Sequence, residues 1–137
     1  MGKEEIFIGH PVVALKFALA NFAANQDGTT VPADTNADAY ALPWGGSIIG
    51  LSVSLNAAVT AETITFKPTV GGTEDTDLSV QLDTTNTQRY SARCDVGKIP
   101  FTANAAIGVV YDSHASFTPT TADGVVTLFV VFDEVEY

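Results

Sequence analysis

Apolar and polar residues alternate along most of this chain, which is the pattern of strands that bury one face. From Ile49 to Asn56 every second residue is large and apolar, and a similar run extends from Ile64 to Val70. Side chains of a strand point alternately to opposite faces, so this period predicts strands with one buried and one solvated face. Turn-like residues 56–58 separate the two runs, and they are therefore predicted to form a long antiparallel pair.

Shorter runs with the same period predict further strands. They lie at Leu78–Leu82, Tyr90–Val96 and Ile107–Tyr111, with a short strand around Tyr40 and Leu42. Polar stretches rich in Asn, Asp, Thr, Pro and Gly separate them, as expected of turns. The whole pattern predicts an all-β fold, an antiparallel β-sandwich or jelly roll of about eight strands.

The first 38 residues are harder to interpret. Their apolar positions fit a strand: Val13, Leu15, Phe17 and Leu19. The Ala-rich run 11–24 also fits a short helix that begins at a proline, but the strand is favoured. Residues 25–38 are polar and predict a long loop, a kind of segment that is usually functional or mobile. We expect one domain, with an arm, strand and loop over 1–38 and the sandwich core over 39–137.

The last run, from Val125 to Phe132, is apolar in both alternating sets. A strand of this kind is covered on both faces, either by loops of its own chain or by another subunit. The predicted subunit-contact face is the set Val126, Leu128, Val130 and Phe132. The acidic residues 133–136 follow and discourage pairing at the end of this strand.

Charge and composition narrow the classes of partner. The chain has 137 residues with 16 acidic and 6 basic side chains, a net charge of −10. Such a protein is repelled by phosphate backbones and anionic lipid, so we expect neither nucleic acid nor membrane as a partner. No apolar run approaches the roughly 20 residues that span a bilayer. The start Met-Gly-Lys-Glu-Glu is acidic where a signal peptide is basic, which predicts synthesis in the cytoplasm.

Side chains with reactive or metal-binding chemistry are few, and no known catalytic motif occurs. His10 and His114 are far apart and have no cysteine nearby. Cys94, the single cysteine, has the inward register of its strand and is expected to be inert. Residues 34–38 are similar to the first half of a calcium loop, but Ala39 replaces the turn glycine and Gly45 the final glutamate. We therefore predict no catalytic residue, metal or cofactor.

Aromatic residues leave a sugar-binding role open. Trp44 lies in a Pro-Trp-Gly-Gly turn, where it either stacks on a ligand or packs under the loop. Four phenylalanines near strand ends are candidates for a contact surface: Phe7, Phe22, Phe101 and Phe117. A sugar hydrolase would need two carboxylates facing each other across a cleft, and only the number of acidic residues speaks for it.

The segment 46–73 resembles β-rich structural proteins of tailed bacteriophage virions. In these, a strand of the form Gly-x-Ile-x-Gly-Leu-Ser-Val leads through Asn-Ala-Ala-x-Thr-Ala-Gly-Thr into a second strand. Residues 82–88 and 119–123 continue the resemblance, which covers roughly 39–132. The chain departs from the pattern at Glu62, where glycine is usual, and at Gly71.

The resemblance implies a capsid decoration (cement) protein or a related accessory protein of the virion. Such proteins commonly form trimers on the outer capsid surface and bridge major capsid subunits. We accordingly expect a homotrimer that binds the major capsid protein, with Ile6, Phe7 and Ile8 as the capsid contact. The alternative is a receptor-binding or carbohydrate-binding module of a phage tail fibre, which would present exposed aromatic side chains.

Overall fold

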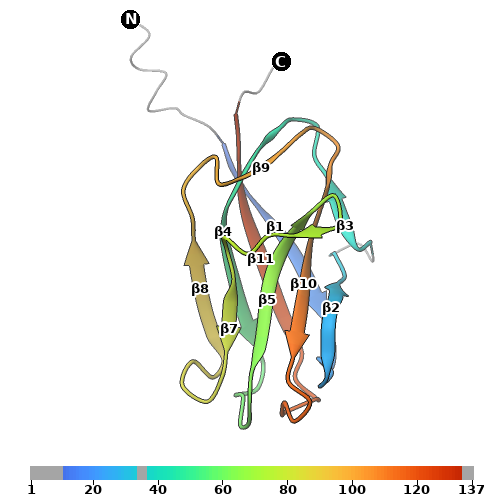
Figure 1. The fold of residues 1–137 in the computed structure, drawn as a ribbon, viewed down its shortest axis with the longest axis vertical. Helices are drawn as coiled ribbons and strands as arrows, with labels where there is room; N and C mark the ends of the chain where they lie inside the picture. Colours follow the sequence, from blue (N-terminus) through green and yellow to red (C-terminus); the bar gives the residue numbers. More distant parts are fainter. Residues whose placement is uncertain (1–10, 34–36, 134–137) are drawn as a thin grey trace, which may run out of the picture.

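The structure is a computed structural model, and it describes residues 11–33 and 37–133. Figure 1 shows two β-sheets packed face to face, and every regular element of the described residues is a strand. These residues therefore include no helix that is long and apolar enough to cross a membrane. In chain order the strands are β1 (Val12–Leu19), β2 (Gln26–Val31), β3 (Ala39–Ala41), β4 (Gly46–Leu55), β5 (Ile64–Val70), β6 (Thr73–Glu74), β7 (Val80–Leu82), β8 (Arg89–Arg93), β9 (Ile99–Phe101), β10 (Ala106–Ser113) and β11 (Gly124–Phe132).

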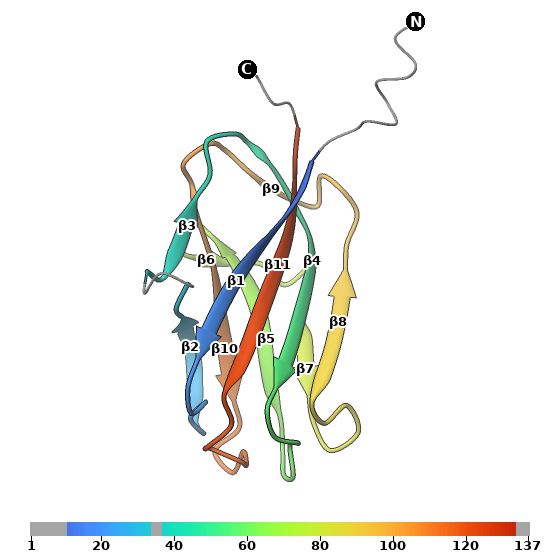
Figure 2. The same cartoon turned by 180° about the vertical axis from the view of Figure 1, so that it is seen from behind.

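The two sheets are antiparallel throughout. The first has the order β1-β11-β4-β8, with β9 also paired to β4, and is called here the β11 sheet. The second has the order β2-β10-β5-β6, with β3 on β10 and β7 on β5, and is called the β10 sheet. The β10 sheet lies in front in Figure 1 and the β11 sheet in Figure 2. The predicted all-β sandwich is confirmed.

The structure has eleven strands among its described residues, compared with the predicted number of about eight. The three additional strands are β2, β6 and β9, which have six, two and three residues. They are too short or too polar to show an alternating pattern. Their strand conformation comes from hydrogen bonding to a longer neighbour, which a local pattern does not record.

The predicted pairing between the runs at 49–56 and 64–70 is wrong. β4 pairs with β11, β8 and β9, whereas β5 pairs with β10, β6 and β7 in the other sheet. The connection between them crosses the sandwich, with Val59 buried and its amide donating to the carbonyl of Thr87 at 2.8 Å. A period of two determines which side chains face the core, but not which strand lies alongside.

Glu62 lies in this connection with φ at 64°, in the left-handed region. This is the position at which the resembling phage proteins usually have glycine. A residue with a Cβ atom pays a steric cost of about 1 kcal/mol there, which glycine avoids. Glutamate at this position therefore adopts the turn with a steric strain that glycine would not have.

Residues 11–33 contribute a strand to each sheet. The strand favoured over the helix is confirmed, because β1 pairs with β11 along its whole length. The predicted long polar loop is wrong for Gln26–Val31, which forms β2 against β10. The register shifts between Tyr111 and Ser113, and Gly28 there has a φ of 64°. Most side chains of β2 are polar. Its sequence therefore lacks the alternation of apolar and polar residues that predicts a strand.

The core fills the space between the two inner faces, as the alternation predicts. At one end, Phe22 packs edge-on against Phe66 and Tyr111, with ring centroids 5.5 and 5.1 Å apart. The Tyr111 hydroxyl accepts a hydrogen bond from the amide of Ala23 at 3.2 Å. Among the described residues no buried side-chain polar atom lacks a partner. The side chains of the two inner faces therefore fill the space between the sheets.

Candidate functional site

The four residues predicted to form the subunit-contact face lie in the core instead. Val126, Leu128 and Val130 have no exposed surface and Phe132 is 5% exposed. They point toward the β10 sheet, because the pairing with β1 and β4 places them on the inner face of β11. The prediction chose the wrong set of side chains. The chain itself covers these four, so they offer nothing to a neighbour.

The other apolar set of β11 forms the outer face. Val125 is 39% exposed, and the half-buried Phe129 lies with its ring over Gly50 of β4. Val12 of β1, which lies alongside Val131, is 60% exposed. The remaining exposed large hydrophobic residues of the described part are Tyr90 of β8 and Val96 just after it. All four thus belong to the β11 sheet or to its edge.

Basic side chains accompany this apolar surface. The five strands of the β11 sheet contain Lys16, Arg89 and Arg93 and no acidic residue. All three are exposed, and none lies within ion-pair distance of a carboxylate of the described residues. Their registers opposite Thr127, Ser54 and Gly50 place them on the outer face. We call Lys16, Arg89 and Arg93, with Val12 and Val125, the "basic face". A surface with only positive charges on its strands is unusual in a chain of net charge −10.

Two shallow grooves lie on the basic face beside Arg89. The larger, about 650 Å³, runs between the ends of β1, β4 and β11 and is lined by Leu19, Leu55, Val125, Arg89 and Asp123. A second groove of about 380 Å³ is lined by the same arginine and by Tyr90. Apolar walls with one cation and one carboxylate suit a protein segment that brings an apolar side chain and polar groups.

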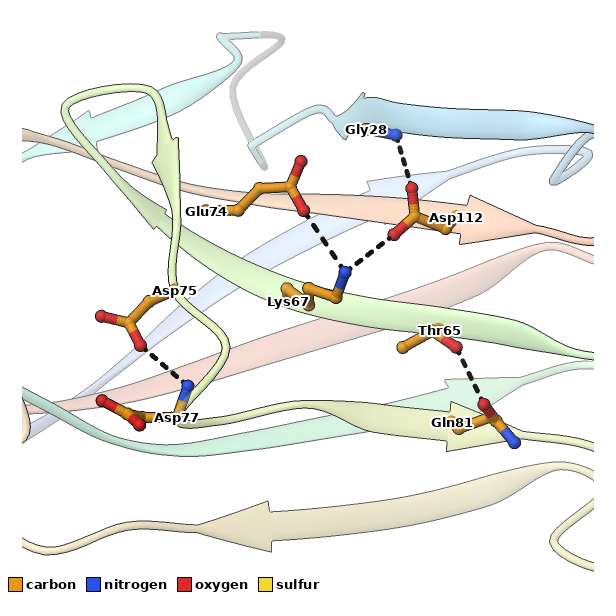
Figure 3. Close-up of polar contacts among 8 residues, drawn as sticks. All are labelled: Gly28, Thr65, Lys67, Glu74, Asp75, Asp77, Gln81 and Asp112. Carbon is orange, nitrogen blue, oxygen red and sulfur yellow. Dashed lines mark hydrogen bonds and ion pairs between the residues drawn. The ribbon is translucent and has the colours of Figure 1, made fainter.

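The outer face of the β10 sheet has a different chemistry (Figure 3). Lys67 of β5 bridges two carboxylates, Asp112 of β10 at 3.1 Å and Glu74 of β6 at 3.4 Å. Asp112 also accepts the amide of Gly28 at 2.7 Å, which ties β2 to the same cluster. These bonds satisfy the charged groups within the chain. The face is therefore polar and self-contained, unlike the basic face.

The Lys67–Asp112 pair shifts the titration of both groups. The hydrogen bond to Asp112 raises the pKa of Lys67. Partial burial acts to raise the pKa of Asp112, but the Gly28 amide and the Lys67 ammonium outweigh it and lower this pKa. A carboxyl whose native pKa is depressed stabilises the fold above its ordinary value of 3.8. That contribution disappears as the pH falls through the native pKa.

Replacing Asp112 with Asn is therefore expected to lower the free energy of unfolding at pH 7 by about 1–2 kcal/mol. Urea unfolding followed by circular dichroism at pH 7, 4 and 3 measures this quantity. The difference between native chain and variant should shrink as the pH falls below 3.8, where the unfolded state is protonated, and disappear once the folded state is protonated as well. Asp77→Asn is the matched control, because this exposed carboxylate forms no ion pair with a described residue. A difference that stays constant with pH would contradict the assignment.

The remaining candidates have structural roles or lie outside the described residues. The Cys94 thiol donates to the Ile48 carbonyl at 3.3 Å, and burial raises its pKa. His114 lies 3.8 Å from Glu62 at the surface. No group of three His, Cys, Asp or Glu side chains within 11–33 and 37–133 could hold a metal ion. His10, Ile6, Phe7, Ile8 and most of the calcium-like segment 34–38 are not among the described residues.

The aromatic candidates are mostly internal. Phe22, Phe101 and Phe117 are core residues and so do not form a contact surface, and Phe7 lies outside the described residues. Trp44 is half-buried and packs edge-on against Phe132, with ring centroids 5.4 Å apart. Tyr90 is the one exposed aromatic residue of the described part. A platform of several stacked aromatic rings for sugars does not form there.

Comparison with known proteins identifies solved structures with a similar fold. No protein-family model matches the sequence, and no curated protein does. A chain of the acidic stable capsid structure of Helicobacter pylori bacteriophage KHP30 superposes with a TM-score of 0.56 at 14% identity, over 93% of this chain and 96% of that one. A chain of the capsid asymmetric unit of cyanophage Pam1 gives a TM-score of 0.52 at 15% identity, over 90% and 86%. The predicted likeness to β-rich bacteriophage virion proteins is confirmed at the level of fold.

Proposed function

We propose that this chain is a structural protein of a bacteriophage virion, which binds the outer surface of the capsid and stabilises it by bridging capsid subunits. The observation that carries the proposal is the end-to-end match with chains of two phage capsid structures. Each match covers most of this chain and most of the capsid chain, so the likeness extends over both sheets of the sandwich. The resemblance of residues 46–73 to virion proteins supports the same assignment from sequence.

The proposed function is to stabilise the capsid shell mechanically. A protein that contacts two neighbouring capsid subunits adds interface free energy that must be lost before the shell expands or bursts. Repeating the contact over many sites makes the total large even when each contact is weak. The partners are the major capsid protein, through Ile6, Phe7 and Ile8, and other copies of this chain in a homotrimer, with the virion as the location. Neither nucleic acid nor membrane is a partner in this proposal.

No catalytic role is part of the proposal. Glu74 and Asp112 both contact Lys67, so an ammonium group lies between these two carboxylates, where a sugar hydrolase would bind its substrate. The alternative of a fibre module for glycans is not favoured, since Tyr90 is a single exposed ring and Trp44 packs on the chain itself.

Binding to capsids tests the proposal directly. Heads assembled from the major capsid protein of the same genome, without this chain, are mixed with the purified protein and sedimented. We expect saturable co-sedimentation at a fixed ratio to capsid protein, and a higher temperature of head disruption measured by light scattering. The variant I6S/F7S/I8S is expected to bind at least about tenfold more weakly, because it loses most of its apolar contact area.

The controls separate the alternatives. A41S, a change to serine at an exposed residue of β3 in the β10 sheet, should bind heads as the native chain does. Absence of co-sedimentation at micromolar concentration would contradict the proposal. Binding to a glycan array, without binding to heads, would favour the fibre module instead.

A further inference from the structure

The two most exposed large hydrophobic side chains of the described residues lie at the same end of the β11 sheet. Val12, 60% exposed, is the first residue of β1, and Val96, 66% exposed, lies in the connection between β8 and β9. Val131 connects them, because it pairs with Val12 and lines one groove of about 190 Å³ with Val96. Phe132 and Asp133 complete the lining of this groove. We call Val12, Val96, Val131 and Phe132 the "terminal patch".

Single exposed hydrophobic residues are common on protein surfaces and need no partner. The terminal patch differs, because its members are contiguous and surround a hollow. A second groove of about 450 Å³ is also lined by Val96, together with the half-buried Ile49 and the oppositely charged Arg93 and Asp95. The charges beside the patch are therefore of both signs, so an occupant is held here by apolar contact and not by its net charge.

The chain itself has an apolar segment next to the patch. The sequence just before β1 is apolar at residues 6–8, which are Ile-Phe-Ile. Residues 9–11, which separate this segment from Val12, are Gly-His-Pro, and both Gly and Pro are typical of turns. β1 begins and β11 ends at the same end of the sandwich (Figures 1 and 2), so the segment is attached beside the patch.

The length of this attachment fits the size of the patch. Neighbouring strands lie about 4.8 Å apart, so one to three strand spacings from β1 correspond to roughly 5–15 Å across the sheet. The three to five residue steps between residues 6–8 and Pro11 cover roughly 10–17 Å when extended. Because the attachment is this short, the effective concentration of the segment at the patch is on the order of millimolar. A second copy at micromolar concentration competes poorly with it.

We propose that Ile6, Phe7 and Ile8 dock on the terminal patch of their own chain in the free protein. The inference goes beyond the proposed function, because it concerns the chain before it meets a capsid. The same three side chains are the proposed capsid contact, and they cannot occupy both places at once. Capsid binding therefore requires their release, and the apparent affinity equals the intrinsic affinity multiplied by the fraction of chains already released.

The fluorescence of Trp44 reports on the terminal patch. It is the single tryptophan of the chain, and its ring packs against Phe132 with centroids 5.4 Å apart. The variant I6S/F7S/I8S is expected to shift the emission of Trp44 to longer wavelength and to increase its quenching by acrylamide, because the docked segment no longer shields the groove. Acrylamide is neutral, so the net charge of the chain does not affect its approach.

Removing the patch should have the same effect as removing the segment. V12S/V96S is expected to increase the quenching of Trp44, and its combination with I6S/F7S/I8S should increase it no further, because both changes remove one and the same contact. The control V125S changes a 39% exposed valine at the opposite end of β11 and should leave the quenching as in the native chain. Circular dichroism of every variant detects a folding defect. Unchanged quenching in I6S/F7S/I8S, or additive effects of the two changes, would overturn the inference.

Disulfide trapping identifies what occupies the patch. Cys94 is first replaced by serine, whose hydroxyl can still donate to the Ile48 carbonyl. Of I6C/V96C, F7C/V96C and I8C/V96C, at least one should then form a disulfide within one chain, in about tenfold or greater excess over disulfide-linked dimers. F7C/Q81C is the matched control, because Gln81 is exposed on β7 of the other sheet, and it should stay reduced.

The remaining outcomes each reject a different claim. No intramolecular disulfide in any of the three variants, or disulfide-linked dimers alone, would overturn docking on the same chain. Exposure of Trp44 by truncation after Asp133, without exposure in I6S/F7S/I8S, would assign the patch to residues 134–137 instead. None of these measurements uses heads. A native chain with protected Trp44 that does not bind heads therefore rejects the capsid role alone, and head binding with Trp44 equally quenched in the native chain and I6S/F7S/I8S rejects the docking alone.

Discussion

Replacing Leu128 with Ala is expected to lower the free energy of unfolding by about 2–5 kcal/mol, the range for a large apolar side chain removed from a packed core. Leu128 has no exposed surface and lies on the inner face of β11, the strand at the centre of its sheet. The neighbouring outward residue Val125 is 39% exposed. Val125→Ala should therefore cost less than about 1 kcal/mol, because little of its area is removed from water by folding.

Denaturant unfolding monitored by circular dichroism measures the free energy of unfolding of both variants. If Val125→Ala were the more destabilising of the two, the assignment of inner and outer faces would be wrong.

Replacing Gly46 with Ala is expected to cost about 3 kcal/mol of stability or to prevent folding, as overpacking in a rigid site does. A Cβ atom at this position would overlap the carbonyl oxygen of Val131 and lie 2.9 Å from the Cα atom of Phe132. Both are backbone atoms of β11, so a side-chain rotation cannot relieve the clash. The whole pairing of β4 with β11 would have to open at this end.

Gly50→Ala is the matched control on the same strand. Its Cβ atom would first meet Cδ2 of the Phe129 ring at 3.2 Å, and this ring lies on the outer face, where it can move. We expect a loss of less than about 1 kcal/mol, measured by thermal and urea unfolding. Equal losses for the two variants would show that the close approach of β4 and β11 at Gly46 is not a constraint.

The sequence predicts the fold class because alternation survives in the long strands. Leu51, Val53 and Leu55 are all core residues, as their positions in the repeat require. Alternation does not specify which strands pair. It therefore predicts β4 beside β5, although the two strands belong to different sheets. A polar strand such as β2 is recognised only through its hydrogen bonds to β10.

The candidate surface was partly predictable. Both sets of β11 side chains are apolar, so alternation alone cannot tell which set faces inward, and the pairing with β1 and β4 decides it. Lys16 lies on β1 and the two arginines on β8, far apart in the sequence, so only the order of the strands in the sheet brings them to one face.

The capsid role is tested most directly by electron cryo-microscopy of heads with and without the bound chain. The account predicts additional density on the outer surface, of the size of this sandwich, that contacts at least two capsid subunits. A difference map without added density, or with density that contacts a single capsid subunit, would contradict the capsid role.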